Sequence, residues 1–136
     1  RFERALAELR QVVWARRRVL YLIWHKPWMG VNRETYISRM LALVGWETLP
    51  VESDERYPKL EVNQALLDTV DLVLFSSEPY HFLPEDLETF ARDYDCPLDK
   101  LRLIDGEMTS WYGSRAIQGL RYLGQLAESV SIVTDS

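Results

Sequence analysis

Apolar residues change their spacing several times along the chain, and each change indicates a new element. Within residues 2–17 they recur every three or four positions, which predicts an amphipathic helix. The next segment, "VLYLIW" (19–24), is apolar throughout, as is typical of a strand buried on both faces. Three further segments predict the remaining strands: 46–51, 71–76 and 101–105.

Helical spacing returns between these strands, and four more helices are expected at residues 32–45, 61–69, 84–94 and 117–126. Asn32 is expected to cap the first of them and Gly45 to end it, and Pro84 suits a first helical turn. The pattern of residues 129–136 is ambiguous. Strands that alternate with helices produce a parallel sheet covered on both faces. The sequence therefore predicts one α/β domain with three α/β/α layers and a parallel sheet of about four strands.

Composition narrows the function classes. The chain has 136 residues, of which 47% are hydrophobic and 27% charged, as in an ordinary globular domain. Its net charge is −5, so nucleic-acid binding is not expected. The basic cluster Arg16–Arg18 falls at the predicted end of the first helix, where cations interact favourably with the helix dipole. Cys96 is the only cysteine, so no internal disulfide forms.

Targeting signals are not evident in the sequence. No apolar run approaches the roughly 18 residues that a transmembrane helix needs, and no signal peptide or initiator methionine precedes the first helix. The chain opens inside a helical pattern. We therefore expect it to be a fragment of a longer protein, with any targeting signal outside this segment.

Four loops connect a predicted strand to the following helix, and they are rich in aromatic residues. In a parallel α/β sheet such loops emerge at the carboxyl ends of the strands, where ligands bind. Their rings belong to Trp24, Trp28, Tyr57, Tyr80, Phe82, Trp111 and Tyr112. Trp24 and Phe82 lie nearest to predicted elements and are expected in the core. The other five predict a binding surface for a bulky, partly apolar, planar ligand, with capping of the sheet as the alternative.

Polar residues on the same loops allow two other chemistries. A metal site would use His25, Glu78, His81 and Asp105. These residues lack a recognised ligand spacing, so no protein-bound metal or other cofactor is expected. An enzyme would use the carboxylates as acid and base, but the chain has no nucleophile elbow, P-loop or dinucleotide-binding glycine motif. Ser114 is better placed as the cap of the last helix. A non-catalytic protein is expected.

The loop sequences together resemble a known family. "LIWHKPWMGVNRETYISRMLALVG", "RYPKL", "SSEPYHF" and "IDGEMTSWYGSR" are similar to the C-terminal lobe of a cobalamin-binding-type receptor. Such receptors are the class III, helical-backbone substrate-binding proteins of ABC importers, which carry cobalamin, ferric siderophores or haem. The resemblance extends from about Val19 to Leu126, and "SSEPY" and "DGEMTSWYGSR" are its most specific parts.

The resemblance implies that this chain is one lobe of a two-lobe receptor. In the family, one long helix joins two α/β lobes, and the ligand lies in the cleft between them. Residues 1–18 would be the helix that leads from this backbone helix, and residues 19–136 the C-terminal ligand-binding lobe. The N-terminal lobe would lie outside this chain. The family's ligand-facing positions fall on Trp28, Tyr57, Glu78, Tyr80, Trp111 and Tyr112. Ser110 is expected, with Glu78, to form hydrogen bonds to the ligand.

One position departs from the family pattern. Family lobes place a glutamate at the start of the helix after "YP", where it pairs with arginines of the membrane permease. The matching residue here is Asn63, and Glu61 lies close by. Docking to an ABC permease would therefore rest on Glu61 or Asn63.

The resemblance implies a periplasmic or membrane-anchored extracytoplasmic receptor for a large metallo-cofactor, with a corrinoid favoured over a ferric siderophore or haem. The metal would belong to the ligand. Two alternatives remain at this point. One is a zinc or manganese receptor that uses the four metal-binding candidates. The other is an interaction module in which the aromatic edge binds another protein or a second copy of the chain.

Overall fold

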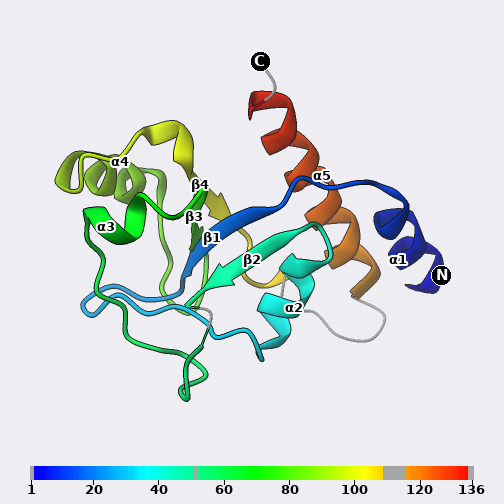
Figure 1. Cartoon of the computed structure of the whole chain (residues 1–136), viewed down its shortest axis with the longest axis horizontal. Helices are drawn as coiled ribbons and strands as arrows, with labels where there is room; N and C mark the ends of the chain where they lie inside the picture. Colours follow the sequence, from blue (N-terminus) through cyan, green and yellow to red (C-terminus); the bar gives the residue numbers. More distant parts are fainter. Residues whose placement is uncertain (1, 51, 109–115, 135–136) are drawn as a thin grey trace.

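The computed structural model describes residues 2–50, 52–108 and 116–134 (Figure 1). In these ranges one helix is followed by strands that alternate with helices, as predicted. The elements in chain order are α1 (Phe2–Gln11), β1 (Arg17–Leu22), α2 (Tyr36–Ala42), β2 (Trp46–Leu49), α3 (Gln64–Leu67), β3 (Leu72–Ser76), α4 (Pro84–Asp93), the short 3-10 helix η1 (Leu98–Lys100), β4 (Leu101–Ile104) and α5 (Ala116–Thr134).

The four strands form one parallel sheet in the order β2-β1-β3-β4. At its centre β1 pairs with β3, so that Val19 lies opposite Leu72 and Leu22 opposite Phe75. Every residue of β3 is buried, as are the last four of β1. Such strands need consecutive apolar residues because both faces of a parallel sheet are covered. The predicted sheet is confirmed.

Helices cover both faces of the sheet. α1, α2 and α5 lie against one face, and α3 and α4 against the other (Figure 1). Tyr21 of β1 packs in the first core layer together with Leu123 of α5. Leu22, its neighbour in the strand, packs in the second layer together with Phe90 of α4. Successive strand residues point to opposite faces, and the three-layer architecture predicted from the sequence is confirmed.

The first helix is shorter than the sequence predicts. α1 ends at Gln11, and β1 begins at Arg17. The assignment of residues 1–18 to a leading helix is therefore wrong beyond Gln11. A helix packed on the face of a sheet needs several connecting residues before the chain can enter the sheet, and residues 12–16 make this connection. Most of the cluster Arg16–Arg18 accordingly belongs to a strand and not to a helix terminus.

The helix after β1 begins later than predicted. Its N-cap is Thr35, whose Oγ1 accepts a hydrogen bond from the Ser38 N–H at 3.1 Å. Asn32 forms the turn before it, since its Oδ1 accepts a hydrogen bond from the Glu34 N–H at 3.0 Å. Gly45 follows the helix with a positive φ of 78°, a conformation that favours glycine. The predicted cap at Asn32 is wrong, and the helix ends at Ala42, three residues before the predicted stop at Gly45.

Other boundaries differ by a few residues. α3 is shorter than the predicted 61–69, β1 begins before residue 19, and β2 ends before residue 51. α5 continues to Thr134, through most of the segment whose pattern is ambiguous. Pro84 occupies the first turn of α4, as predicted. Element ends are set by caps and by tertiary packing, which a periodic pattern does not specify.

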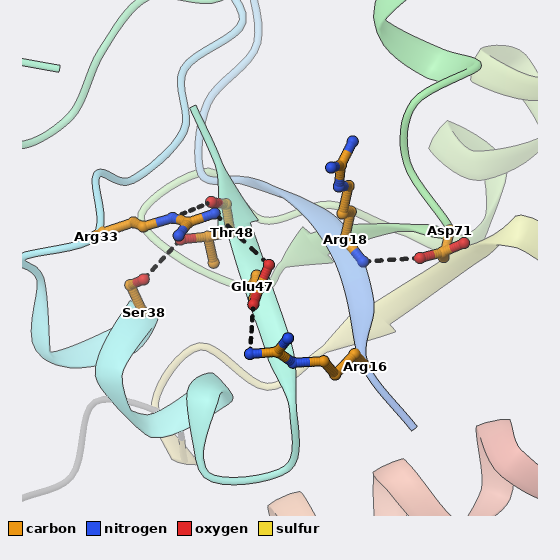
Figure 2. A network of polar contacts seen from close by, with 7 residues as sticks. All are labelled: Arg16, Arg18, Arg33, Ser38, Glu47, Thr48 and Asp71. Carbon is orange, nitrogen blue, oxygen red and sulfur yellow. Dashed lines mark hydrogen bonds and ion pairs between the residues drawn. The ribbon is translucent and has the colours of Figure 1, made fainter. Parts of the chain in front are cut away.

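A buried pair of hydroxyl groups joins α2 to β2. The Ser38 and Thr48 hydroxyls lie 2.6 Å apart, and both residues are buried. Arg33 extends the contact to the surface: its Nε–H donates to the Thr48 carbonyl at 3.1 Å, and its guanidinium lies 3.9 Å from the Glu47 carboxylate (Figure 2). Buried polar groups cost free energy unless they are hydrogen-bonded. The pair therefore helps to fix the position of α2 on the edge strand.

Replacing one hydroxyl of this pair should leave the other buried without its partner. We expect Thr48→Val to lower the free energy of unfolding by about 1–3 kcal/mol, measured by urea denaturation. The double variant Ser38→Ala/Thr48→Val should be more stable than the sum of the two single losses implies. Thr89→Val on the exposed surface of α4 is the control and should change stability by less than about 0.5 kcal/mol. Additive losses would show that the two hydroxyls are not coupled.

Candidate functional site

Loops that follow β1 and β2 meet beyond the carboxyl end of β1. After the strand the chain turns back, so that the Ile23 N–H donates to the Met29 carbonyl at 2.9 Å. The loop that leads to α3 lies alongside, where the Gly30 N–H donates to the Pro58 carbonyl at 3.0 Å. These backbone bonds bring Tyr57 next to the end of β1.

Serine side chains hold the loop after β3. The Ser76 hydroxyl donates to the Glu78 carbonyl at 2.7 Å, and the Ser77 hydroxyl accepts a hydrogen bond from the Gly106 N–H at 3.0 Å. A Cβ at position 106 would lie 2.2 Å from Ser76 Oγ and 3.0 Å from Glu78 Cγ. Glycine is therefore required where the loop after β4 crosses the loop after β3. This crossing fixes the backbone position of Glu78.

An open pocket of about 480 Å³ lies between these loops. It is lined by Ile23, Trp24, Met29, Ile37, Tyr57, Glu78, Pro79 and Gly106. Trp24 and Tyr57 are 40% and 44% exposed, so their rings are accessible to a ligand. Most lining residues are apolar, and the volume falls within the range of roughly 300–1,000 Å³ that is usual for small-molecule sites. The pocket can therefore bind a bulky apolar or amphipathic group.

The pocket brings together part of the predicted binding surface. Tyr57 and Glu78 line it directly. Tyr80 lies next to it, because its ring packs edge-on against Trp24 with the ring centroids 5.7 Å apart. Four residues with predicted roles lie outside the described part of the chain: Ser110, Trp111, Tyr112 and Ser114. Their roles stay predictions.

Trp28 lies on the α4 side of the sheet edge and does not line the pocket. Its ring stacks on Phe82 with centroids 6.2 Å apart and meets Phe90 edge-on at 5.4 Å. The Trp28 Nε1–H donates to the Tyr94 hydroxyl at 2.9 Å. These contacts correspond to the sheet-capping role that the sequence leaves as an alternative.

Trp24 was expected in the core, but it lines the pocket. The expectation for Phe82 is confirmed, because this residue is only 3% exposed. β1 begins and ends two residues before the predicted strand 19–24, so Trp24 lies beyond the strand end, where it forms an antiparallel bridge with Met29. The other pocket residues that the sequence did not indicate are Ile23, Met29, Ile37, Pro79 and Gly106. A strand predicted to start at Arg17 would have ended before Trp24 and would have placed this residue in the loop.

The residues of the alternative metal site do not come together in the described part of the chain. Its members would be His25, Glu78, His81 and Asp105, but the described residues contain no group of three or more His, Cys, Asp or Glu that could hold a metal ion. His25 instead packs on Trp28, with ring centroids 4.3 Å apart. His81 Nδ1 lies 3.3 Å from the Ser77 carbonyl. The hypothesis of a zinc or manganese receptor depended on this set, and this arrangement does not support it.

A second cavity, of about 340 Å³, lies beside the end of β4 and is lined in part by Leu103, Asp105 and Tyr122. The Tyr122 hydroxyl accepts a hydrogen bond from the Asp105 N–H at 2.9 Å, which ties α5 to the strand. Burial raises the pKa of Tyr122 above its ordinary value. The hydrogen bond from the Asp105 N–H partly opposes this effect, and the Asp105 carboxylate adds to it. Tyr122 therefore serves as a neutral structural contact at this edge.

The predicted docking residues lie at the start of α3. Asn63 is its N-cap, since its Oδ1 accepts a hydrogen bond from the Leu66 N–H at 2.9 Å. Its side chain is therefore engaged within its own helix. Glu61 is exposed and lies two residues before Asn63 in the chain. The docking role of both residues stays a prediction.

Several solved structures share this fold. The periplasmic vitamin B12 binding protein BtuF of Vibrio cholerae superposes with a TM-score of 0.73 at 14% sequence identity, over 95% of this chain and 51% of that one. The periplasmic heme binding protein HutB of Vibrio cholerae gives 0.68 at 15% identity, over 91% and 52%. S. aureus IsdE complexed with heme gives 0.64 at 13%, over 93% and 53%. No family model matches the sequence, and neither does any curated protein.

The chain has the fold of one lobe of the class III, helical-backbone substrate-binding proteins of ABC transporters, as the sequence resemblance implies. It spans about half the length of these proteins. At such low identity the property shown to be shared is the fold. Among the described helices, none is both long enough and apolar enough to cross a membrane.

The glycine at the loop crossing provides a test of this geometry. We expect Gly106→Ala to lower the free energy of unfolding by roughly 1–3 kcal/mol, because the added methyl group displaces the Ser76 hydroxyl. Gly124→Ala in α5 is the matched control, since its Cβ would meet only the flexible end of Leu9 at 3.0 Å. Chemical denaturation measures both. Equal stability of the two variants would contradict the assigned crossing.

The raised pKa of Tyr122 predicts a pH-dependent contribution to stability. The contribution is complete below the unfolded-state pKa of about 10 and is lost as pH rises through the higher folded-state value. Tyr122→Phe should cost roughly 1–2 kcal/mol at neutral pH, because the Asp105 N–H loses its acceptor. This difference from the unchanged protein should shrink above about pH 10. Urea unfolding at several pH values measures it, and a constant difference would argue against the raised pKa.

Proposed function

We propose that this chain is the C-terminal lobe of an ABC-importer substrate-binding protein, and that its pocket binds part of a large metal chelate. The observation that supports the proposal most strongly is the position of the pocket. It lies at the carboxyl edge of the parallel sheet, where α/β proteins bind ligands, and it is lined by exposed aromatic rings and aliphatic side chains. The protein is a binding protein without catalytic activity.

A corrinoid is the favoured ligand, ahead of a ferric siderophore or haem. Solved proteins with this fold include a vitamin B12 binding protein and heme binding proteins, which agrees with a ligand of this size class. The planar rings of Trp24 and Tyr57 can pack against a macrocycle or its side groups. The cobalt or iron belongs to the ligand, so the protein needs no metal-binding residues of its own.

The remaining parts of the proposal concern the whole protein. A second lobe would cover the ligand from the other side of the cleft, because a pocket of about 480 Å³ covers only part of such a chelate. An ABC permease would receive the ligand, with docking at Glu61 and Asn63. The protein would work outside the cytoplasm, as the periplasmic proteins with this fold do.

Calorimetric titration with cyanocobalamin, haem and a ferric hydroxamate tests the proposal without interference from ligand absorbance. One of the three should bind, and Trp24→Ala and Tyr57→Ala should each weaken it about tenfold or more, which corresponds to about 1.4 kcal/mol or more. The control is Trp14→Phe, because the Trp14 indole donates to the Leu9 carbonyl far from the pocket.

Two results would contradict the proposal. Binding of none of the three ligands by the full-length protein would do so. So would self-association that is abolished by Trp24→Ser, because the exposed rings would then form a protein interface and not a ligand site.

A further inference from the structure

Glu78 is the charged residue of the pocket. Among the described residues that line it, one carries a charge, and no lysine or arginine does. The pocket is otherwise formed by aliphatic, aromatic, proline and glycine residues. A ligand that fills it therefore meets a single negative charge on an apolar wall.

The position of Glu78 is set by its neighbours. Its backbone carbonyl accepts the Ser76 hydroxyl at 2.7 Å, and its own N–H donates to the same hydroxyl oxygen at 3.3 Å. Gly106 lies against its side chain, so a Cβ there would be 3.0 Å from Glu78 Cγ. Glu78 thus sits on a loop that is tied to the end of β3. Its charge is consequently presented from a defined place at the sheet edge.

The Glu78 carboxylate is available to a ligand. Within the described part of the chain it forms neither an ion pair nor a side-chain hydrogen bond. A carboxylate accepts hydrogen bonds and cannot donate one. When a ligand excludes water from such a group, an N–H, O–H or cationic group stabilises it, and a second anion destabilises it. The wall of the pocket therefore distinguishes ligands by charge.

We propose that Glu78 selects for neutral or cationic chelates that offer hydrogen-bond donors, and against chelates that place a carboxylate or another anionic group at this wall. The inference rests on the proposed ligand-binding function and makes it more specific. Corrinoids with amide side chains and neutral or ammonium-bearing ferric hydroxamates meet the requirement. Haem meets it only if its propionates point away from Glu78.

The test uses pairs of ligands that differ in charge and little else. The pairs are cyanocobalamin and its monocarboxylic acid derivative, ferrioxamine B with its free ammonium group and its neutral N-acetyl derivative, and haem dimethyl ester and haem. In any pair that binds, the more negatively charged member should bind at least about fivefold more weakly. Glu78→Gln should reduce this difference to less than about twofold, because the glutamine keeps the shape and removes the charge.

A matched control separates direct contact from the general charge of the protein. Glu34→Gln removes an exposed carboxylate just before α2 that does not line the pocket, and it should leave the discrimination within each pair unchanged. Melting temperatures of both variants should match that of the unchanged protein. A structural role of Glu78 would instead lower the melting temperature of Glu78→Gln.

The outcomes distinguish this inference from the function on which it rests. Failure of every pair to bind would overturn the proposed function. Two other results would overturn only the role of Glu78. In one, Glu78→Gln keeps the same preference within a pair; in the other, the unchanged protein binds both members of a pair equally well. A preference that Glu34→Gln reduces as much as Glu78→Gln would also overturn it, because the general charge would then be responsible.

Discussion

β1 and β3 lie side by side at the centre of the sheet, and nearly all of their side chains are buried between the two helical layers. Alternate residues contribute to different layers, as Tyr21 and Leu22 do. A slip of one residue would therefore exchange the two layers and mismatch both cores. Because the strands are parallel, their carboxyl ends also lie at one edge, and the loops that follow them meet there. The location of the pocket thus follows from the pairing of the central strands.

The loops at that edge are closely packed, and their backbone groups are satisfied by short side chains. Ser76 and Ser77 bind the loop after β3 and the start of the loop after β4. Gly106 has no Cβ, so the Ser76 hydroxyl can lie next to it without a steric clash. The same contacts that close the end of the sheet also position Glu78. The residues that stabilise this edge of the sheet, Ser76, Ser77 and Gly106, are consequently also the ones that set the position of the charge in the pocket.

The architecture was predictable because its signals are local. The apolar runs and the helical repeats predicted four parallel strands between two helical layers, and the positions of the connecting loops predicted the edge at which a ligand would bind. Which of the aromatic rings line the pocket was not predictable in the same way. Trp24 and Trp28 belong to one loop, yet Trp24 faces the pocket and Trp28 packs under α4. The contact of Trp28 with Tyr94 joins residues that are 66 positions apart in the chain.

The sequence by itself determined the order of the elements, the parallel sheet and the edge where the aromatic loops gather, because hydrophobic periodicity depends on near neighbours along the chain. Only the tertiary structure decided which rings line the pocket, that the metal-binding candidates do not converge, and that Glu78 is the charge on its described wall. The direction of a side chain in a loop depends on backbone bonds and packing between distant segments. A one-dimensional pattern of apolar and polar residues does not contain that information.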